Sequence, residues 1–245
     1  LDFTSSEVQT LYYDKDSALW IGTIDDGAFR YDRSEFKNYS QLNGLKSNAV
    51  NGFAADTLGN IWMANADSGL AVLPLATEAQ DALQYITTND GLSSNRISCI
   101  TADAFGHLWV GTRDAGLNKI LITGSLRTNP LNILSYGTDE EIGSNSVNCI
   151  LTDRRNNVYV GTEGGGISII RGSDVININQ ADGLNTSNVY SLILDRTGNL
   201  WAGTDRGVTK LSFNKDLTVK NITNYGSNDG FKGVEAYQNA SYLDS

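Results

Sequence analysis

The stretch Leu108-Trp109-Val110-Gly111-Thr112 decides the fold, because it recurs four more times along the chain. Its other copies are Leu19-Trp20-Ile21-Gly22-Thr23, Ile61-Trp62-Met63-Ala64-Asn65, Val158-Tyr159-Val160-Gly161-Thr162 and Leu200-Trp201-Ala202-Gly203-Thr204. The aromatic residues stand roughly 40 to 50 residues apart, a period that indicates a repeat architecture. The fold class therefore follows from what one repeat builds.

Each repeat contains short apolar runs rich in Val, Ile, Tyr and Trp, separated by Gly, Asn and Asp. This composition predicts short strands joined by tight turns. We predict four strands in the second repeat, at about 50–56, 60–65, 69–73 and 82–86, and no helical window outside 76–83. Four strands per period are typical of a propeller blade.

The sequence thus predicts an all-β fold, a β-propeller of four-stranded antiparallel blades that occupies residues 1–245 as a single region. The repeats run at about 1–42, 43–90, 91–142, 143–183 and 184–230, with the start of a sixth at 231–245. Because only five repeats and one strand are present, we expect a partial propeller or part of a larger one.

The first strand of each repeat carries a small residue followed by a large one. The small residues are Thr10, Gly52, Cys99, Cys149 and Ser191, and the large ones are Leu11, Phe53, Ile100, Ile150 and Leu192. Because successive strand residues point to opposite faces, bulky side chains of one blade should meet hollows in the next. The aromatic anchors should supply most of the apolar burial, which gives a structural role to Trp20, Trp62, Trp109, Tyr159 and Trp201.

An aspartate stands six residues before each aromatic anchor, in the turn between the first two strands: Asp14, Asp56, Asp103, Asp153 and Asp195. Aspartate in such a turn accepts hydrogen bonds from backbone amides two residues on. We interpret these residues as structural.

The composition excludes several classes of function. The chain has 18 Lys plus Arg, 28 Asp plus Glu and a formal charge of −10, so nucleic acid is not expected as a partner. Two cysteines do not make a disulfide framework, and no apolar run is long enough to span a membrane. With a single histidine, His107, which we expect to be exposed and inert, neither a metal site nor a Ser-His-Asp triad is supported. We expect no cofactor.

Function should lie where the repeats differ, in the turn between the second and third strands and in the linker between blades. In propeller topology these segments lie on one face, where charged side chains could converge at the mouth of the channel. The candidate ligand-binding residues are Lys46, Arg96, Arg113, Asp114, Asp25, Asp67, Glu163, Asp205 and Arg206. Carboxylates and guanidinium groups there would suit sugar hydroxyls or a uronate, and a simple solvated surface is the alternative.

The pattern Asp-x-x-Gly-x-Leu-Trp-x-Gly-Thr, with the linker Asp90-Gly91-Leu92-Ser93-Ser94-Asn95-Arg96-Ile97, resembles the two-component regulator propeller repeat. Ala64, Asn65 and Tyr159 depart from it. The resemblance implies the periplasmic sensor part of a bacterial membrane receptor, with seven-bladed propellers and a histidine kinase or diguanylate cyclase as output. It also implies that we have part of a longer receptor, which meets the membrane only through segments outside this chain.

Three hypotheses follow for function. The first is a sensor module that binds an oligosaccharide and signals through a conformational or dimer change, with self-association of the sensor. The second is a protein-interaction scaffold. The third is a propeller enzyme similar to the streptogramin lyases, for which this stretch lacks an evident catalytic base and metal site, so we expect that the chain itself is not an enzyme.

Overall fold

The computed structural model describes residues 7–74, 83–123, 131–140, 142–230 and 236–237, and these form five four-stranded antiparallel sheets. The first three sheets comprise β1 (Val8–Tyr13), β2 (Leu19–Thr23), β3 (Ala28–Tyr31) and β4 (Phe36–Tyr39); β5 (Val50–Ala55), β6 (Ile61–Asn65), β7 (Leu70–Leu73) and β8 (Gln84–Ile86); and β9 (Ile97–Ala102), β10 (Leu108–Thr112), β11 (Leu117–Leu121) and β12 (Asn132–Tyr136). The last two comprise β13 (Val147–Thr152), β14 (Val158–Thr162), β15 (Ile167–Arg171) and β16 (Asp174–Ile178), then β17 (Val189–Leu194), β18 (Leu200–Thr204), β19 (Gly207–Phe213) and β20 (Val219–Tyr225).

Within every sheet the strands pair in chain order, as in a propeller blade, which confirms the all-β fold and the four-stranded repeat. In the second repeat the observed strands match the predicted ones within two residues. Short 3₁₀ helices follow the outer strands: η1 (Gln41–Asn43), η3 (Thr88–Asp90), η4 (Thr138–Glu140), η5 (Gln180–Asp182) and η6 (Ser227–Asp229). The expected start of a sixth repeat lies almost wholly outside the described residues.

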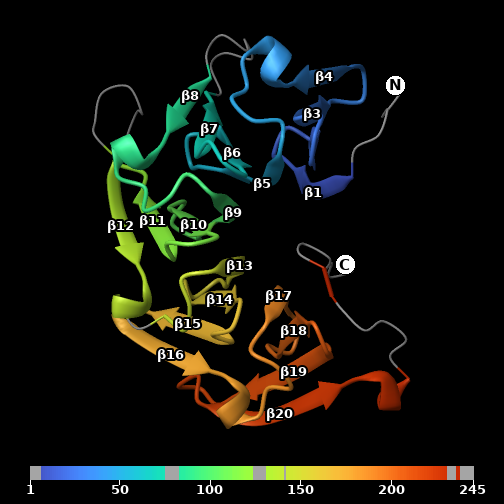
Figure 1. Cartoon of the computed structure of the whole chain (residues 1–245), viewed down its shortest axis with the longest axis vertical. Coiled ribbons are helices and arrows are strands. Elements are labelled where there is room, and N and C mark those ends of the chain that lie inside the picture. The colour runs from blue at the N-terminus through green and yellow to red at the C-terminus, as the bar shows by residue number, and fades with distance from the viewer. Residues whose placement is uncertain (1–6, 75–82, 124–130, 141, 231–235, 238–245) are drawn as a thin grey trace. The chain divides into compact units, whose positions relative to one another are not determined.

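The chain divides into two compact units, Leu1–Ser135 and Tyr136–Ser245, and we describe each by itself. In the first unit, β1 packs against β5 and β5 packs against β9, so that the innermost strands of its three blades lie side by side (Figure 1). In the second unit, β13 and β14 pack against β17. Whether residues 1–245 form a single propeller region stays a prediction.

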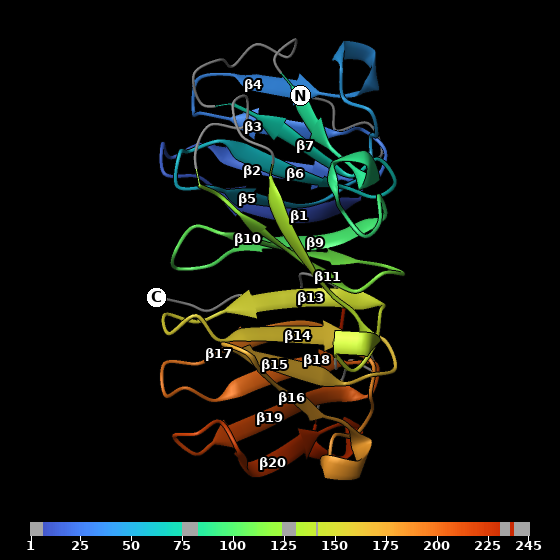
Figure 2. The ribbon, with the colours of Figure 1, turned by 90° about the vertical axis from the view of Figure 1, so that its left-hand side faces the viewer.

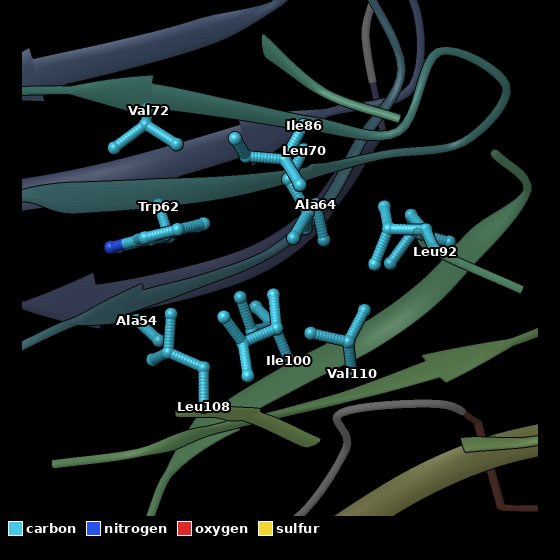
Figure 3. Packing of buried hydrophobic residues seen from close by; sticks show 12 residues of the cluster. Ala54, Trp62, Ala64, Leu70, Val72, Ile86, Leu92, Ile100, Leu108 and Val110 are labelled. Atoms are coloured by element: carbon cyan, nitrogen blue, oxygen red, sulfur yellow. The ribbon is translucent and has the colours of Figure 1, made fainter. Parts of the chain in front are cut away.

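Neighbouring blades interlock as the pattern of small and large residues predicts. Phe53 of the second blade packs against Trp20 of the first, with ring centroids 5.7 Å apart. Ile100 of the third blade lies against Gly52 and in one cluster with Trp62 and Ala64 (Figure 3). In the second unit, Leu192 shares a cluster with Cys149 and Tyr159. In the first blade no described residue covers the corresponding face, and Leu11 is 63% exposed.

Ala64, which departs from the glycine of the repeated pattern, is explained by its cross-strand partner. Ala64 pairs with Gly52 on β5, whereas Gly161 pairs with Cys149 on β13. A Cβ on Gly161 would lie 2.5 Å from the Cys149 sulfur, a distance that real contacts do not reach. The fourth blade therefore has room for one side chain at this pair, and the second blade carries its side chain on the other strand.

The repeated aspartates hold the turn and the tryptophan together. Asp56 Oδ1 accepts the backbone N–H groups of Leu58 and Asn60, and Asp56 Oδ2 accepts the indole N–H of Trp62 at 2.9 Å. The same indole bond recurs at Trp20, Trp109 and Trp201, and in the fourth blade the Tyr159 hydroxyl donates to Asp153 at 3.3 Å. These bonds fit the predicted turn role, and the aspartate–indole bond was not predicted.

Burial supports the structural role of the aromatic anchors. Trp20, Trp62, Trp109 and Tyr159 are buried, and Trp201 is half-buried. Both cysteines are free thiols with buried side chains.

His107 differs from its predicted exposure. It is half-buried, and its Nδ1 accepts the backbone N–H of Ile122 at 3.3 Å. The turn places the ring beside β11, where its Nδ1 can satisfy a backbone donor, so the predicted exposure of His107 was wrong.

Candidate functional site

We use the word rim for the turns between the second and third strands of each blade together with the linkers that precede the first strands. Backbone bonds join the turns of the first four blades to the linkers of their own blades; for example, Arg113 N donates to Arg96 O and Glu163 N donates to Ser146 O. Others join the turns of the first, second and fourth blades to the linker of the next blade, as from Gly69 N to Asn95 O and from Gly166 N to Ser187 O. Turns and linkers therefore lie together at one end of the strands, as predicted; Figure 2 shows the turns at both strand ends.

The third blade brings three of the candidate residues together. Arg96 and Asp114 form an ion pair with a nitrogen–oxygen distance of 3.2 Å, and their side chains are 60% and 42% exposed. Arg113 is exposed beside them. Burial raises the pKa of the Cys99 thiol on the inner strand β9 to about 12, although the hydrogen bond from Ser98 and the positive charge of Arg113 act to lower it.

The other candidates of the first unit do not join this group. The ammonium of Lys46 lies 4.1 Å from the ring centroid of Tyr85, on the outer strand β8 of its blade. Asp25 and Asp67 are exposed, and within the described part of the chain neither carboxylate accepts a hydrogen bond or forms an ion pair.

In the second unit the rim carboxylates bind the linkers of their own blades. Glu163 Oε2 accepts the Ser146 hydroxyl at 3.2 Å, and Asp205 Oδ2 accepts the Asn188 amide at 2.8 Å. Arg206 is exposed. In the third, fourth and fifth blades, the residue directly before the first strand thus binds an acidic residue in the turn between the second and third strands. Comparison of the repeats could have revealed this relation.

A cleft at the opposite end of the strands was not predicted. It lies between the first two blades, with Trp20, Ile61 and Leu73 as apolar lining and Lys15, Asp16 and Arg30 as charged lining. Arg30 is already paired with Asp32 at 3.2 Å. The lining comes from the structural turns and strands that all repeats share, so no difference among repeats points to it.

Among the described residues, no group of three or more His, Cys, Asp and Glu side chains is arranged to hold a metal ion. No described helix has the length and apolar character needed to cross a membrane. What the rim offers chemically is a set of exposed guanidinium, carboxylate, hydroxyl and amide groups.

Comparison with known families gives one match. The family described as "Two component regulator propeller" matches residues 2–25, 91–114, 141–164 and 183–206. Each matched segment runs from the linker, across the first two strands, to the rim turn that follows β2, β10, β14 or β18. No curated protein matches the chain.

Solved structures show the same fold. The extracellular domain of a hybrid two component system from B. thetaiotaomicron is 22% identical with a TM-score of 0.68, over 89% of this chain and 30% of that one. The extracellular domain of a one component system from B. thetaiotaomicron is 20% identical with a TM-score of 0.71, over 90% and 31%. Virginiamycin B lyase from Staphylococcus aureus is 14% identical with a TM-score of 0.65, over 91% and 71%. The chain therefore spans about three tenths of the length of the two B. thetaiotaomicron domains.

Proposed function

Since the chain belongs to the two component regulator propeller family, we propose that it is a ligand-sensing part of a bacterial signal-transduction receptor, exposed outside the cytoplasm in the periplasm. The proposed ligand is an oligosaccharide that carries a carboxylate, bound at the rim of the third blade. The chain itself performs no catalysis in this proposal, and a separate domain supplies the output.

The single observation that carries the proposal is the exposed cluster of Arg96, Arg113 and Asp114. It lies where the repeats differ, and it combines two guanidinium groups with one carboxylate in a chain whose formal charge is −10. Guanidinium groups bind carboxylates through paired hydrogen bonds, and a carboxylate accepts bonds from sugar hydroxyls. Because only one of the two arginines is paired with the aspartate, the other remains available to a uronate.

Signalling requires that the ligand binds one arrangement of the sensor better than another. Its differential affinity then shifts the population toward that arrangement, either within one chain or between two self-associated sensors.

The experiment is a thermal-shift screen of the chain against oligosaccharides of galacturonate and neutral oligosaccharides. A ligand at about a hundred times its Kd should stabilise the protein by about 2.7 kcal/mol. Arg113→Ala should abolish the shift. The matched control is Arg155→Ala, which removes the same charge from the β13–β14 turn at the other end of a blade.

A shift that both variants retain would remove the third blade from the proposal. A shift with neutral sugars alone would contradict the carboxylate. If no sugar shifts the melting temperature, the proposed ligand class is wrong and a protein partner becomes the better hypothesis.

A further inference from the structure

The rim turn of the second blade differs from the others in how its polar side chains are satisfied. In the other blades a threonine begins the turn, and its hydroxyl donates to a glycine carbonyl, as from Thr112 to Gly116 at 2.8 Å. The same hydroxyl accepts a backbone N–H in the first, third and fifth blades, for example from Ala115 at 2.9 Å. These turns therefore leave no polar atom of the threonine without a partner.

Asn65 occupies the place of this threonine, and its side chain is fully buried. Among the residues that the structure describes, neither its Nδ2 nor its Oδ1 has a hydrogen-bond partner, and the buried hydroxyl of Ser68 in the same turn also lacks one. The backbone of the turn is nevertheless closed in the usual way, with Asn65 N donating to Gly69 O at 3.0 Å. Three unsatisfied atoms are thus concentrated in four residues, although buried polar groups in native proteins are normally hydrogen-bonded.

We propose that the Asn65–Gly69 turn is a binding site for a hydroxyl group, supplied by a water molecule or by a hydroxyl of a ligand bound at the rim. An amide offers one acceptor and a donor, and a serine hydroxyl offers both, so the pair matches a neutral group that can donate and accept. Only the ligand-supplied form rests on the proposed function.

The site adjoins the charged cluster of the third blade through the backbone. Gly69 N donates to Asn95 O at 2.9 Å, and the next residue, Arg96, carries the ion pair with Asp114. The turn and the ion pair are therefore held by adjacent residues of one linker, Asn95 and Arg96. Asp67, between the two buried residues, is exposed on the same turn.

The first test asks whether the asparagine costs stability. Asn65→Thr restores the side chain of the other blades and removes the two unsatisfied atoms, so it should raise Tm by at least about 2–4 °C. Thr112→Asn, the matched control, places the same amide in the third blade and should lower Tm. If neither substitution changes Tm, an amide in this turn has no unmet hydrogen-bonding requirement and the proposal is overturned.

The second test identifies the source of the hydroxyl group and uses the unmodified protein. In a high-resolution crystal structure of the protein without sugar, a water within about 3.2 Å of both the Asn65 amide and the Ser68 hydroxyl would establish water as the occupant. If that position is empty, soaking with a galacturonate oligosaccharide should place a hydroxyl there. An empty position in both crystals would overturn the proposal. Because the water result involves no sugar, it stands or falls separately from the proposed function.

Discussion

A side chain added to the glycine two residues after the aromatic anchor should destabilise the blade. The exception is a blade whose cross-strand partner has lost its own side chain. In the fourth blade, a Cβ added at Gly161 would lie 2.5 Å from the sulfur of Cys149 and 2.7 Å from Cγ1 of Val189 in the next blade. Both neighbours are buried, at 7% and 0% exposure, so neither can move away freely. Overpacking of this kind costs about 1–3 kcal/mol.

We therefore expect Gly161→Ala to lower the free energy of unfolding by that amount, which corresponds to a fall in Tm of roughly 2–10 °C. The control is Gly52→Ala in the second blade, where the nearest atom, Cγ2 of Ile100, is 3.3 Å away and the loss should be smaller. The double variant Cys149→Gly with Gly161→Ala reproduces the natural pair of the second blade, Gly52 and Ala64.

The assay is urea unfolding of the four proteins: the parent, the two glycine variants and the double variant. The double variant should be more stable than Gly161→Ala alone, because Cys149→Gly removes the sulfur with which the new methyl group would clash. If the double variant is instead less stable than Gly161→Ala, the two positions do not share one space and the explanation of Ala64 is wrong.

Three further predictions test other parts of the structure. Trp62→Phe removes the indole donor to Asp56 and should cost about 1–3 kcal/mol in urea unfolding, whereas Trp201→Phe, at a half-buried position, should cost less. Burial raises the pKa of Asp195, but hydrogen bonds from Trp201 and neighbouring groups outweigh it and hold that pKa well below its usual range. The carboxylate should therefore stabilise the fold above about pH 4 and lose this contribution as the pH falls further, a dependence that Asp195→Asn should reduce in acid unfolding curves. Because burial raises the pKa of Cys99 to about 12, its thiol should not react with a disulfide reagent at pH 8 until the protein unfolds; rapid labelling of the folded protein would contradict its burial.

The strands were predictable because their signals are local and repeated five times. The aromatic anchors, the turn aspartates and the alternation of small and large residues each correspond to a contact that every blade needs, such as Phe53 against Trp20. The indole bond to aspartate was missed because a spacing of six residues reveals its geometry only when the hairpin register is known. His107 was misjudged for a similar reason, since its backbone partner Ile122 follows β11, fifteen residues further along the chain.

The candidate site was less predictable, because the sequence shows which positions differ among the repeats but not the direction in which a long side chain extends. Arg96 and Asp114 come together across the linker and the turn of one blade, while Lys46 extends to Tyr85 on the outer strand. The unsatisfied amide of Asn65 depends on the exact placement of a buried side chain. A substitution from threonine to asparagine does not predict it, since both residues are common in turns.

The measurement that tests the central claim most directly is hydrogen–deuterium exchange of the protein with and without galacturonate oligosaccharide. We predict slower exchange in the rim segments of the second and third blades, residues 65–69, 93–97 and 112–116, with no change in the opposite turns at 14–18 and 56–60. Protection confined to those opposite turns, or no protection in any segment, would contradict the assignment of ligand recognition to the rim.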